Sequence, residues 1–536
     1  MNKKLVSYKS TLMVIGSALF ITVFANLTMF LKAHEWLTGS NSNQIHFFTL
    51  VAYQFLILTF LLSILTAHKW NRLVICIFFL LASFSAYFAD TYGVIIDRDM
   101  LVNASQTNLS EASGLLSWKF AIYLLVLFLI PSAIIYKLPF HRATFTKTFV
   151  THSLVATFSL ASIGVLFFST SAFSASFFRE QKQIRVYSNP LNALYASYQV
   201  VNKGYLTPAK EFVKIGEDAT INRAAPAREL IILVVGETAR ADRFALNGYN
   251  KNTNPLLSKE AVISFSNASS CGTSTAISVP CMFSLDGKER FDLSNFKNTE
   301  NVLDVAARAG VNILWRDNNS SSKGVADRLT YEDFSTSKNN SICDPECRDV
   351  GMLKGLDEYI NKQKTGDILI VLHQMGSHGP SYHERVPENF QKFQPTCTTN
   401  QLDKCSTEQI SNSYDNTILY TDYFLSEVIN LLKKYDDNFE TSMLYVSDHG
   451  ESLGEYGMYL HGMPYSMAPK GVTNIPIIMW LGKHMISSQK IDMSAFNKHR
   501  DKSISHDNLS HTLMGMFEIK TSVYKKELDL HLLGIN

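Results

Sequence analysis

The chain has 536 residues, more than one ordinary domain needs, and a formal net charge of +2. So balanced a charge argues against a nucleic-acid partner and against an acidic tail. The mean hydropathy of +0.02 averages two unlike parts. Leu, Ile, Phe, Val and Ala dominate up to about residue 175, and a water-soluble composition follows from about residue 225. We therefore expect a membrane domain over 1–175, an interfacial linker helix over 176–225 and a soluble domain over 226–536.

Five apolar stretches are long enough, or nearly so, to cross a bilayer core, which takes about 20 helical residues. They are Thr11–Leu31, Phe47–Ala67, Leu73–Ala89, Leu115–Tyr136 and His152–Phe173. The third is short, and we expect it to extend toward Gly93. The first has the position of a signal peptide, but four more stretches follow and no small-residue cleavage site stands out. We predict five transmembrane helices, the first being a retained anchor.

Basic residues before and between these stretches predict their orientation. The sides expected to face the cytoplasm carry Lys3, Lys4 and Lys9, then His68, Lys69 and Arg72, then Lys137, Arg142 and Lys147. The loops on the other side, 32–46 and 90–114, carry Lys32 and Arg98. Because basic residues favour the cytoplasmic side, the N-terminus is expected there. Five crossings then place the soluble domain outside the cytoplasm.

Six of the seven cysteines are close sequence neighbours, and Cys76 lies in an apolar stretch. The six are Cys271 with Cys281, Cys343 with Cys347, and Cys397 with Cys405. Local pairs in an oxidising compartment predict three disulfides. The alternatives are six buried thiols or a zinc site, but the CxxC or HxxxH spacing of zinc sites is missing.

Two segments near the membrane carry polar patterns. Asn103, Thr107 and Glu111 are four residues apart, so a helix would place them on one face. That face is either simply solvated or turned toward the soluble domain. Between 176 and 200, aromatic residues alternate with Arg179, Lys182 and Arg185, a mixture that suits a helix at the membrane interface.

The soluble part predicts an α/β domain with a mostly parallel sheet and helices on both faces. Glu229–Gly236 is a continuous apolar run typical of a fully buried strand. Similar runs are Val311–Trp315, Asp367–Leu372 and Ser442–Val446, and helical patterns such as 301–309 and 414–434 separate them. In such sheets, functional sites lie at the C-terminal ends of the strands.

Carboxylates and imidazoles follow three of these runs, and together they predict a metal site. They are Glu237, His373, His378, Asp448 and His449, with His461 thirteen residues after Asp448. A lone histidine is more often structural, but three strands ending in such groups are hard to attribute to chance. The mixture of His, Asp and Glu favours zinc, with manganese second, because magnesium and calcium sites use fewer histidines.

The nucleophile is expected in the small-residue segment 269–276. A turn that starts a helix offers backbone N–H groups to an anion, and a nearby metal ion can lower the pKa of a hydroxyl. Chemistry alone does not choose among Ser270, Thr273, Ser274 and Thr275. The alternative is a Ser/Thr-rich loop held by a disulfide between Cys271 and Cys281.

Five motifs resemble those of the lipid A phosphoethanolamine transferases, a family that includes transferable colistin-resistance enzymes. They are VVGETARAD over 234–242, SCGTSTA over 270–276, WRDNN over 315–319, LHQMGSHGP over 372–380 and YVSDHGESLG over 445–454. The resemblance covers nearly the whole chain. It implies an alkaline-phosphatase/sulfatase-like fold in the periplasm, anchored in the bacterial inner membrane, and we expect a monomer.

The resemblance also assigns roles to residues. Thr275 becomes the nucleophile that carries phosphoethanolamine, with Glu237, Asp448 and His449 as its partners at one tightly bound zinc ion. The remaining assignments are His378 and His461 for a second metal or the phosphate group, Ser320 and Lys323 for substrate phosphate, His373 as an accessory residue, and Asn103, Thr107 and Glu111 for the ethanolamine end. The chain departs from the family pattern in the short spacing of Cys343 and Cys347 and in residues 244–246.

The implied reaction moves phosphoethanolamine from phosphatidylethanolamine to a lipid A phosphate through a phospho-threonine, and polymyxin resistance would result. An acceptor in the lipopolysaccharide core or another envelope glycan is the alternative. The Cys/Ser-x-Pro-x-Arg core of sulfatases is absent around Cys271, and a phosphatase would not need five spans. The cysteine pairs argue against a phosphoglycerol transferase, and the complete ligand set argues against an inactive binding protein.

Overall fold

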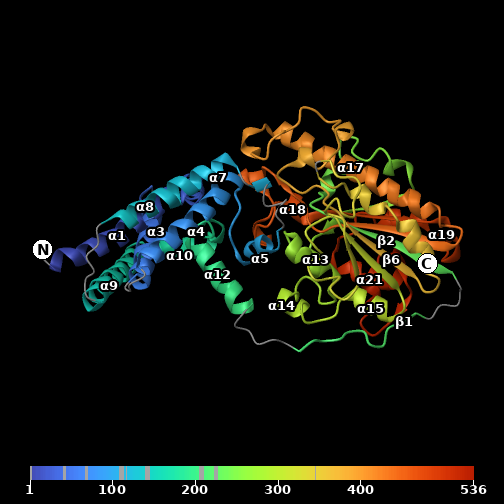
Figure 1. Cartoon of the computed structure of the whole chain (residues 1–536), viewed down its shortest axis with the longest axis horizontal. Coiled ribbons are helices and arrows are strands. Elements are labelled where there is room, and N and C mark those ends of the chain that lie inside the picture. The colour runs from blue at the N-terminus through green and yellow to red at the C-terminus, as the bar shows by residue number, and fades with distance from the viewer. Residues whose placement is uncertain are drawn as a thin grey trace. The chain divides into compact units, whose positions relative to one another are not determined.

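A computed structural model describes residues 3–39, 44–66, 71–107, 114–115, 117–138, 145–204, 211–221, 227–344 and 346–535, and the side chains of all of these except 3–9 and 203–204. The chain forms two compact units (Figure 1). The helical unit comprises Met1–Leu101 and Leu116–Asn202, and the α/β unit comprises Val102–Leu115 and Lys203–Asn536. Most of the described part of the expected linker belongs to the helical unit, whereas the described residues 102–107 and 114–115 belong to the α/β unit.

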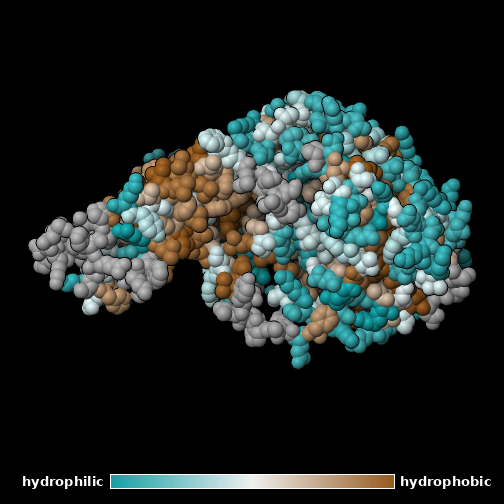
Figure 2. Space-filling model, in the orientation of Figure 1, coloured by the Kyte–Doolittle hydropathy of each residue, from teal (hydrophilic) through white to brown (hydrophobic). Residues whose placement is uncertain are grey.

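The helical unit is built from long apolar helices joined by short segments. Its helices are α1 (Lys3–Phe24), α2 (Leu27–Gly39), α3 (Ile45–Leu65), α4 (Asn71–Tyr92), the first residues of α5 (Arg98–Gln106), α7 (Trp118–Tyr123), η1 (Leu124–Leu129), α8 (Ile130–Lys137), α9 (Phe145–Ser169), α10 (Ser171–Glu180), α11 (Lys182–Arg185) and α12 (Leu191–Gly204). Figure 2 shows hydrophobic residues gathered on the surface of this unit. Such a surface is stable in lipid but not in water.

Four described helices are long and apolar enough to cross a membrane, and a bent pair makes a fifth span if it counts as one. The four are α3, α4, α9 and the continuous segment Trp118–Lys137. The segment α4 ends at Tyr92, so the third stretch does extend toward Gly93. The fifth stretch begins earlier than expected, at Phe145, and ends at Ser169 instead of Phe173.

The first stretch is not one straight helix, which corrects the expectation for Thr11–Leu31. The chain bends by 60° between α1 and α2. At the bend, the Asn26 side-chain amide donates to Ile21 O at 3.0 Å, in addition to the helical backbone bond from Ala25 N to the same oxygen. The same amide donates to Asn189 O at 3.1 Å and its oxygen accepts from Asn189 N at 2.8 Å. The bend is therefore held by hydrogen bonds to a distant part of the chain.

The α/β unit contains an eight-stranded sheet in the order β11-β3-β10-β7-β2-β6-β4-β5. The strands are β2 (Arg228–Gly236), β3 (Val262–Ser269), β4 (Asn312–Asp317), β5 (Thr330–Asp333), β6 (Ile368–His373), β7 (Phe439–Ser447), β10 (Asn474–Leu481) and β11 (Ile504–Ser505). All neighbours are parallel except β10, which runs antiparallel to β3 and β7. The sheet is thus mixed, with seven parallel strands.

Helices cover both faces of this sheet, as expected (Figure 1). One face packs on α13 (Thr275–Phe283), α15 (Val302–Arg308) and α21 (Asp507–Met516), whose apolar side chains join those of the strands in one core. The long helix α17 (Thr407–Lys433) lies on the other face and begins with a capping box of Ser406 and Gln409. Because both faces are covered, β2 is buried almost throughout and reads as a continuous apolar run.

Shorter elements complete the α/β unit. They are β1 (Thr220–Ile221), β12 (Ile519–Lys520), β8 (Ser452–Leu453), β9 (Tyr459–Leu460), α14 (Leu293–Phe296), α16 (Leu356–Lys362), α18 (Lys470–Thr473), α19 (Lys483–Ser488) and α20 (Met493–His499). The six paired cysteines form the three expected disulfides, Cys271–Cys281, Cys343–Cys347 and Cys397–Cys405. Cys76 is free and buried in the helical unit.

Candidate metal and catalytic site

Four neighbouring parallel strands end at the same edge of the sheet and bring their terminal residues together. Gly236 of β2 lies beside Ser447 of β7, and His373 of β6 lies beside Val235 and Asp317. Glu237 and Asp448 are each one residue beyond these positions. The order β7-β2-β6-β4 therefore gathers the predicted strand-end residues at one place, as the general rule for such sheets requires.

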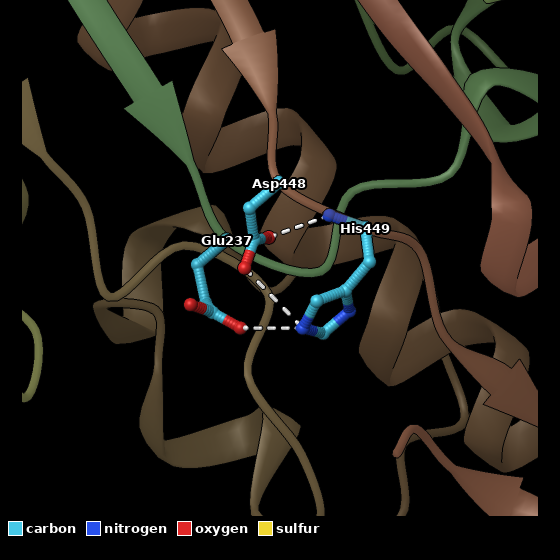
Figure 3. A group of neighbouring side chains, drawn as sticks. All are labelled: Glu237, Asp448 and His449. Carbon is cyan, nitrogen blue, oxygen red and sulfur yellow. Dashed lines mark hydrogen bonds and ion pairs between the residues drawn. The ribbon is translucent and has the colours of Figure 1, made fainter. Parts of the chain in front are cut away.

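Glu237, Asp448 and His449 form a buried cluster whose possible ligand atoms all lie within 4.8 Å of one another. Figure 3 shows the three side chains pointing toward a common centre. His449 Nε2 is 3.6 Å from Glu237 Oε1 and 3.3 Å from Asp448 Oδ2. Two carboxylates and one imidazole at this spacing are a familiar ligand set for a divalent cation.

The hydrogen bonds around the cluster direct lone pairs toward its centre. His449 Nδ1 donates to Gly450 O at 2.8 Å, and burial lowers the pKa of His449 to about 4, so the ring is neutral with its lone pair on Nε2. Asp448 Oδ1 accepts from Thr238 N at 3.1 Å and His449 N at 2.7 Å. Asp448 Oδ2 is buried and accepts no hydrogen bond in the described structure. A buried carboxylate oxygen beside an imidazole lone pair is what a metal ion would satisfy, so these residues fit a metal site.

Thr275 lies against this cluster, at the first residue of α13. Its Oγ1 is 3.1 Å from Glu237 Oε2 and 3.5 Å from His449 Nε2. In contrast, Ser270 Oγ donates to Gly272 O at 2.6 Å and Thr273 Oγ1 donates to Met463 O at 2.6 Å. Of the four candidate hydroxyls, Thr275 is the one with described contacts to the metal-ligand cluster. A helix start also favours negative charge on this oxygen.

His378 and His461, which were predicted to hold a second metal or the phosphate group, lie near the cluster but are not among its three residues. The His461 ring centroid is 4.5 Å from that of His449 and 5.1 Å from that of His378. His461 Nδ1 lies 3.1 Å from Glu451 Oε1, and Glu451 Oε2 accepts from Gly379 N at 3.3 Å. Glu451 therefore fixes the loop of His378 and the ring of His461 together.

Ser320 and Lys323 lie close together, and residues 102–107 reach them. Lys323 Nζ donates to Ser320 Oγ at 2.6 Å and to Gln106 O at 3.4 Å. Helix α5 ends at Gln106, so Asn103 is helical whereas Thr107 is not, and Thr107 Oγ1 donates to Asn103 O at 3.0 Å. Glu111 lies outside the described residues. The expected helix face over Asn103, Thr107 and Glu111 thus stops short of Thr107.

His373 is part of a buried pair behind the site. Its Nδ1 is 3.0 Å from Asp317 Oδ2, which also accepts from Trp315 Nε1 at 2.8 Å. Burial by itself raises the pKa of Asp317, but the contacts with His373 and Trp315 hold that pKa below its ordinary value. Asp317 Oδ1 accepts from Asn319 N at 2.9 Å, so the pair fixes the turn after β4.

Sequence reasoning missed two residues that support the cluster. Asn319 Nδ2 donates to Glu237 Oε2 at 2.8 Å and to Gln374 O at 2.8 Å, which ties the ends of β2, β4 and β6 together. Asp349 accepts from Met375 N and Gly376 N at 2.9 and 3.1 Å, and burial raises the pKa of its carboxyl. Asn319 is the last residue of the WRDNN motif, so its position just after a strand could have identified it as a site residue. Asp349 follows no strand and carried none.

Comparisons with known proteins agree with this architecture. Residues 54–205 match the family described as phosphoethanolamine transferase EptA/EptB, and residues 229–519 match the sulfatase family. The chain is 38% identical to phosphatidylethanolamine transferase Mcr-2 of Escherichia coli over 521 residues, 95% of each chain. It is 37% identical to phosphoethanolamine transferase EptA of Escherichia coli strain K12 over 525 residues, 96% of this chain and 95% of that one.

A solved structure extends the likeness to the whole fold. The integral membrane protein lipooligosaccharide phosphoethanolamine transferase A (EptA) from Neisseria meningitidis superposes with a TM-score of 0.92 at 32% sequence identity, and the match covers 97% of each chain. Sequence identity above 30% over nearly all of both chains identifies the family, and the strand-end cluster agrees with it. The chain belongs to the phosphoethanolamine transferase family of integral membrane enzymes.

Proposed function

We propose that the protein transfers phosphoethanolamine from phosphatidylethanolamine to a phosphate of lipid A through a phosphorylated Thr275. The observation that carries this proposal is the position of Thr275 Oγ1, 3.1 Å from Glu237 in the cluster with a neutral His449. Membership of the transferase family supplies the reaction class. The relatives' names support the donor, a phosphatidylethanolamine, and an acceptor in lipooligosaccharide.

Glu237, Asp448, His449 and Thr275 would hold the metal ion, which we propose to be one Zn²⁺. Nitrogen and oxygen donors without thiolates suit zinc, and four ligands match its preferred number. When bound, the ion would lower the pKa of the Thr275 hydroxyl and offset negative charge on the phosphoryl oxygens. His378 and His461 are proposed to hold a second ion or to contact the phosphate group.

In the first step, Thr275 Oγ1 forms a bond to the donor phosphorus, and the bond from phosphorus to the glycerol oxygen breaks. Thr275 gives up its hydroxyl proton, and diacylglycerol leaves with one proton on the glycerol oxygen, so the step balances. Lys323 Nζ, placed by Ser320 Oγ at 2.6 Å, supplies positive charge for the substrate phosphate. The N–H groups at the start of α13 favour the anionic phosphoryl oxygens.

In the second step, an oxygen of the acceptor phosphate bonds to the same phosphorus, and the bond to Thr275 Oγ1 breaks. Thr275 takes up the proton that the acceptor phosphate gives up. Because Glu451 faces His461 Nδ1 at 3.1 Å, proton exchange with the substrate would use the Nε2 atom of His461. Asn103 and Thr107 are proposed to meet the ethanolamine end, beside Lys323.

Both substrates are membrane lipids, which explains why the catalytic unit is attached to membrane helices. We propose five spans, with the bent pair as the first, a cytoplasmic N-terminus and a periplasmic catalytic unit in the inner membrane, and a monomeric enzyme. The added ethanolamine carries a positive charge, so modified lipid A would attract polymyxins less. A core sugar phosphate is the alternative acceptor and would use the same site.

Mass spectrometry of lipid A from cells that express wild type, Thr275→Ala, Thr275→Ser or Thr273→Ala tests the proposal. We expect the phosphoethanolamine adduct from wild type and from Thr273→Ala, less from Thr275→Ser, and none from Thr275→Ala. Trapping the donor on the purified enzyme should give a phosphoethanolamine adduct on the peptide that contains Thr275.

Each result bears on a separate part of the proposal. Equal adduct from wild type and Thr275→Ala would reject the nucleophile. A donor adduct on Thr275 without modified lipid A would keep the nucleophile and move the acceptor to the core oligosaccharide.

A further inference from the structure

The helical unit contains a cavity of about 230 Å³ that shares no residue with the catalytic cluster. It lies among α2, α3, α10, α11 and α12, three of which are labelled in Figure 1. Its lining includes Tyr53, Gln54, Phe178, Arg185, Leu191 and Tyr195. It is smaller than the roughly 300–1,000 Å³ of pockets that enclose a whole ligand, so it suits part of a long molecule.

The walls of the cavity are mostly apolar. The Tyr53 and Phe178 rings pack edge to face with centroids 5.4 Å apart, and Tyr53 OH is 2.8 Å from Ser174 Oγ. Gln54 lies deeper, where its amide donates to Asn189 O at 2.9 Å and its oxygen accepts from Ser188 Oγ at 2.5 Å. Its hydrogen-bonding groups are thus engaged within the protein, and the cavity offers apolar surface to an occupant.

Arg185 supplies a positive charge at this cavity that has no anionic partner in the described structure. Its guanidinium carbon lies 5.8 Å from the centre of the Phe178 ring, and its Nε is buried without a hydrogen-bond acceptor. The nearby Arg179 differs, because its guanidinium is paired with Glu180 at 2.7 Å. A partly buried guanidinium whose donor is unmet is suited to a phosphate oxygen, which accepts strong, charge-assisted hydrogen bonds.

The position of Arg185 in the chain indicates that a lipid phosphate is the anion within its reach. Helix α10 begins two residues after the membrane-spanning α9 ends, so α10 and α11 start at the boundary between lipid tails and head groups. Tyr195 of α12 lines the cavity and is 60% exposed, as tyrosines at such boundaries are. Phosphodiesters and acyl chains meet at this depth.

We propose that this cavity binds one glycerophospholipid, with its phosphate on Arg185 and a segment of an acyl chain between Tyr53, Phe178 and Leu191. The site is distinct from the one that carries out the transfer, and it does not rest on the proposed function. It would keep a lipid attached to the helices that follow the last span.

Photo-crosslinking of the full-length protein in vesicles of phosphatidylethanolamine and phosphatidylglycerol tests the proposal. The probe is a phospholipid with a diazirine near the glycerol end of one acyl chain. We expect cross-links on peptides that contain residues 45–65 and 171–195. Labelling spread evenly over all spans would overturn the proposal, and this measurement needs no variant to fold.

Two matched substitutions then test the charge. Arg185→Gln keeps a polar side chain but removes the cation, and we expect labelling of these peptides to fall about tenfold, in line with the loss of a charge-assisted hydrogen bond. Arg179→Gln removes a cation from the same segment that is already paired, and labelling should stay at the wild-type level. Equal labelling of both variants would overturn the role of Arg185.

Competition identifies the part of the lipid that is recognised. An excess of unlabelled phospholipid should remove the labelling, whereas diacylglycerol with the same chains should remove much less. If diacylglycerol competes equally well, the cavity recognises acyl chains alone and the phosphate assignment is wrong. If glycerophosphate without chains competes equally well, the acyl-chain assignment is wrong.

Discussion

The two units of this protein differ in which residues they leave exposed and in which polar residues they bury. In the helical unit Phe158 and Phe168 are 72% and 81% exposed, whereas Asn26, Gln54 and Asn189 are buried and bonded to one another. In the α/β unit the apolar strands are buried and polar groups gather at the strand ends. Lipid is as apolar as leucine, so apolarity does not tell which side of a membrane helix is inside, and the polar network does.

The comparison therefore predicts that buried polar groups have different roles in the two units. In the α/β unit we expect the strand-end cluster to carry out the transfer, so changing it should abolish activity while the unit stays folded. In the helical unit the amide network bears the structure, so changing it should lower stability. Four predictions test this division, from the largest expected effect to the smallest.

Asp448→Asn should remove bound zinc and reduce transfer by more than about 100-fold. Loss of a residue that only supports a metal ligand typically reduces activity by about 10- to 100-fold, so a direct ligand should exceed that range. The amide keeps the shape of the side chain but loses the charge that Oδ2 directs at the cluster centre. Metal content by mass spectrometry and the transfer rate measure this. Asp501→Asn, at an exposed carboxylate, is the control. Full zinc occupancy in Asp448→Asn would contradict the ligand assignment.

Asn26→Leu should destabilise the helical unit by about 1–3 kcal/mol, because Asn189 N loses its acceptor inside the protein. Thermal unfolding of the purified protein in detergent micelles measures it. The matched control is Phe158→Leu on the lipid-facing surface, which should change stability by less than about 0.5 kcal/mol. Equal effects of the two substitutions would contradict the contrast between the units.

His531 should make the stability of the α/β unit depend on pH. Burial lowers the pKa of His531 to about 4 from an ordinary 6.5, so the folded ring stays neutral where the unfolded ring binds a proton. Its contribution is therefore complete above pH 6.5 and is lost as pH falls toward 4, by about 2 kcal/mol at pH 5.

The wild type should lose more stability between pH 7.5 and pH 5 than His531→Gln does, as measured by chemical unfolding. His499→Gln, at an exposed histidine of α20, should keep the wild-type slope. The amide network of the helical unit does not titrate, so Asn26→Leu should also keep that slope. Identical slopes for wild type and His531→Gln would show that His531 is not the source.

Asn319→Ala should reduce transfer by about tenfold with zinc retained, because Glu237 loses one hydrogen bond but keeps its charge. Steady-state kinetics and metal content measured on the same sample check this. Asn319→Asp should restore no activity, since a carboxylate cannot donate to Glu237. A zinc-free Asn319→Ala would instead make Asn319 necessary for metal binding.

The sequence by itself predicted the α/β class of the second unit, four of the eight strands of its sheet and the residues that meet at their ends. A strand covered on both faces is apolar throughout, so Glu229–Gly236 identified β2, and the residue after it was Glu237. Parallel strands end at one edge, so Asp448 and His449 were expected near Glu237 before any strand order was known. The cysteine pairs were equally local, because partners four to ten residues apart can be recognised directly.

Tertiary structure alone decided what depends on distant partners. The 60° bend at Asn26 lies in a stretch whose hydropathy gives no sign of it, and Asn189, which holds it, is 163 residues away. Helix α9 begins before His152, and that buried histidine contacts Ser10 and Thr66 on other elements at 3.0 and 3.3 Å. Asn319 reaches Glu237 because β4 lies two strands from β2, and strand order is not written in any single strand. A local sequence pattern depends on the helix or strand in which a residue lies. These roles depend instead on contacts with other elements, and those contacts form only when the chain folds.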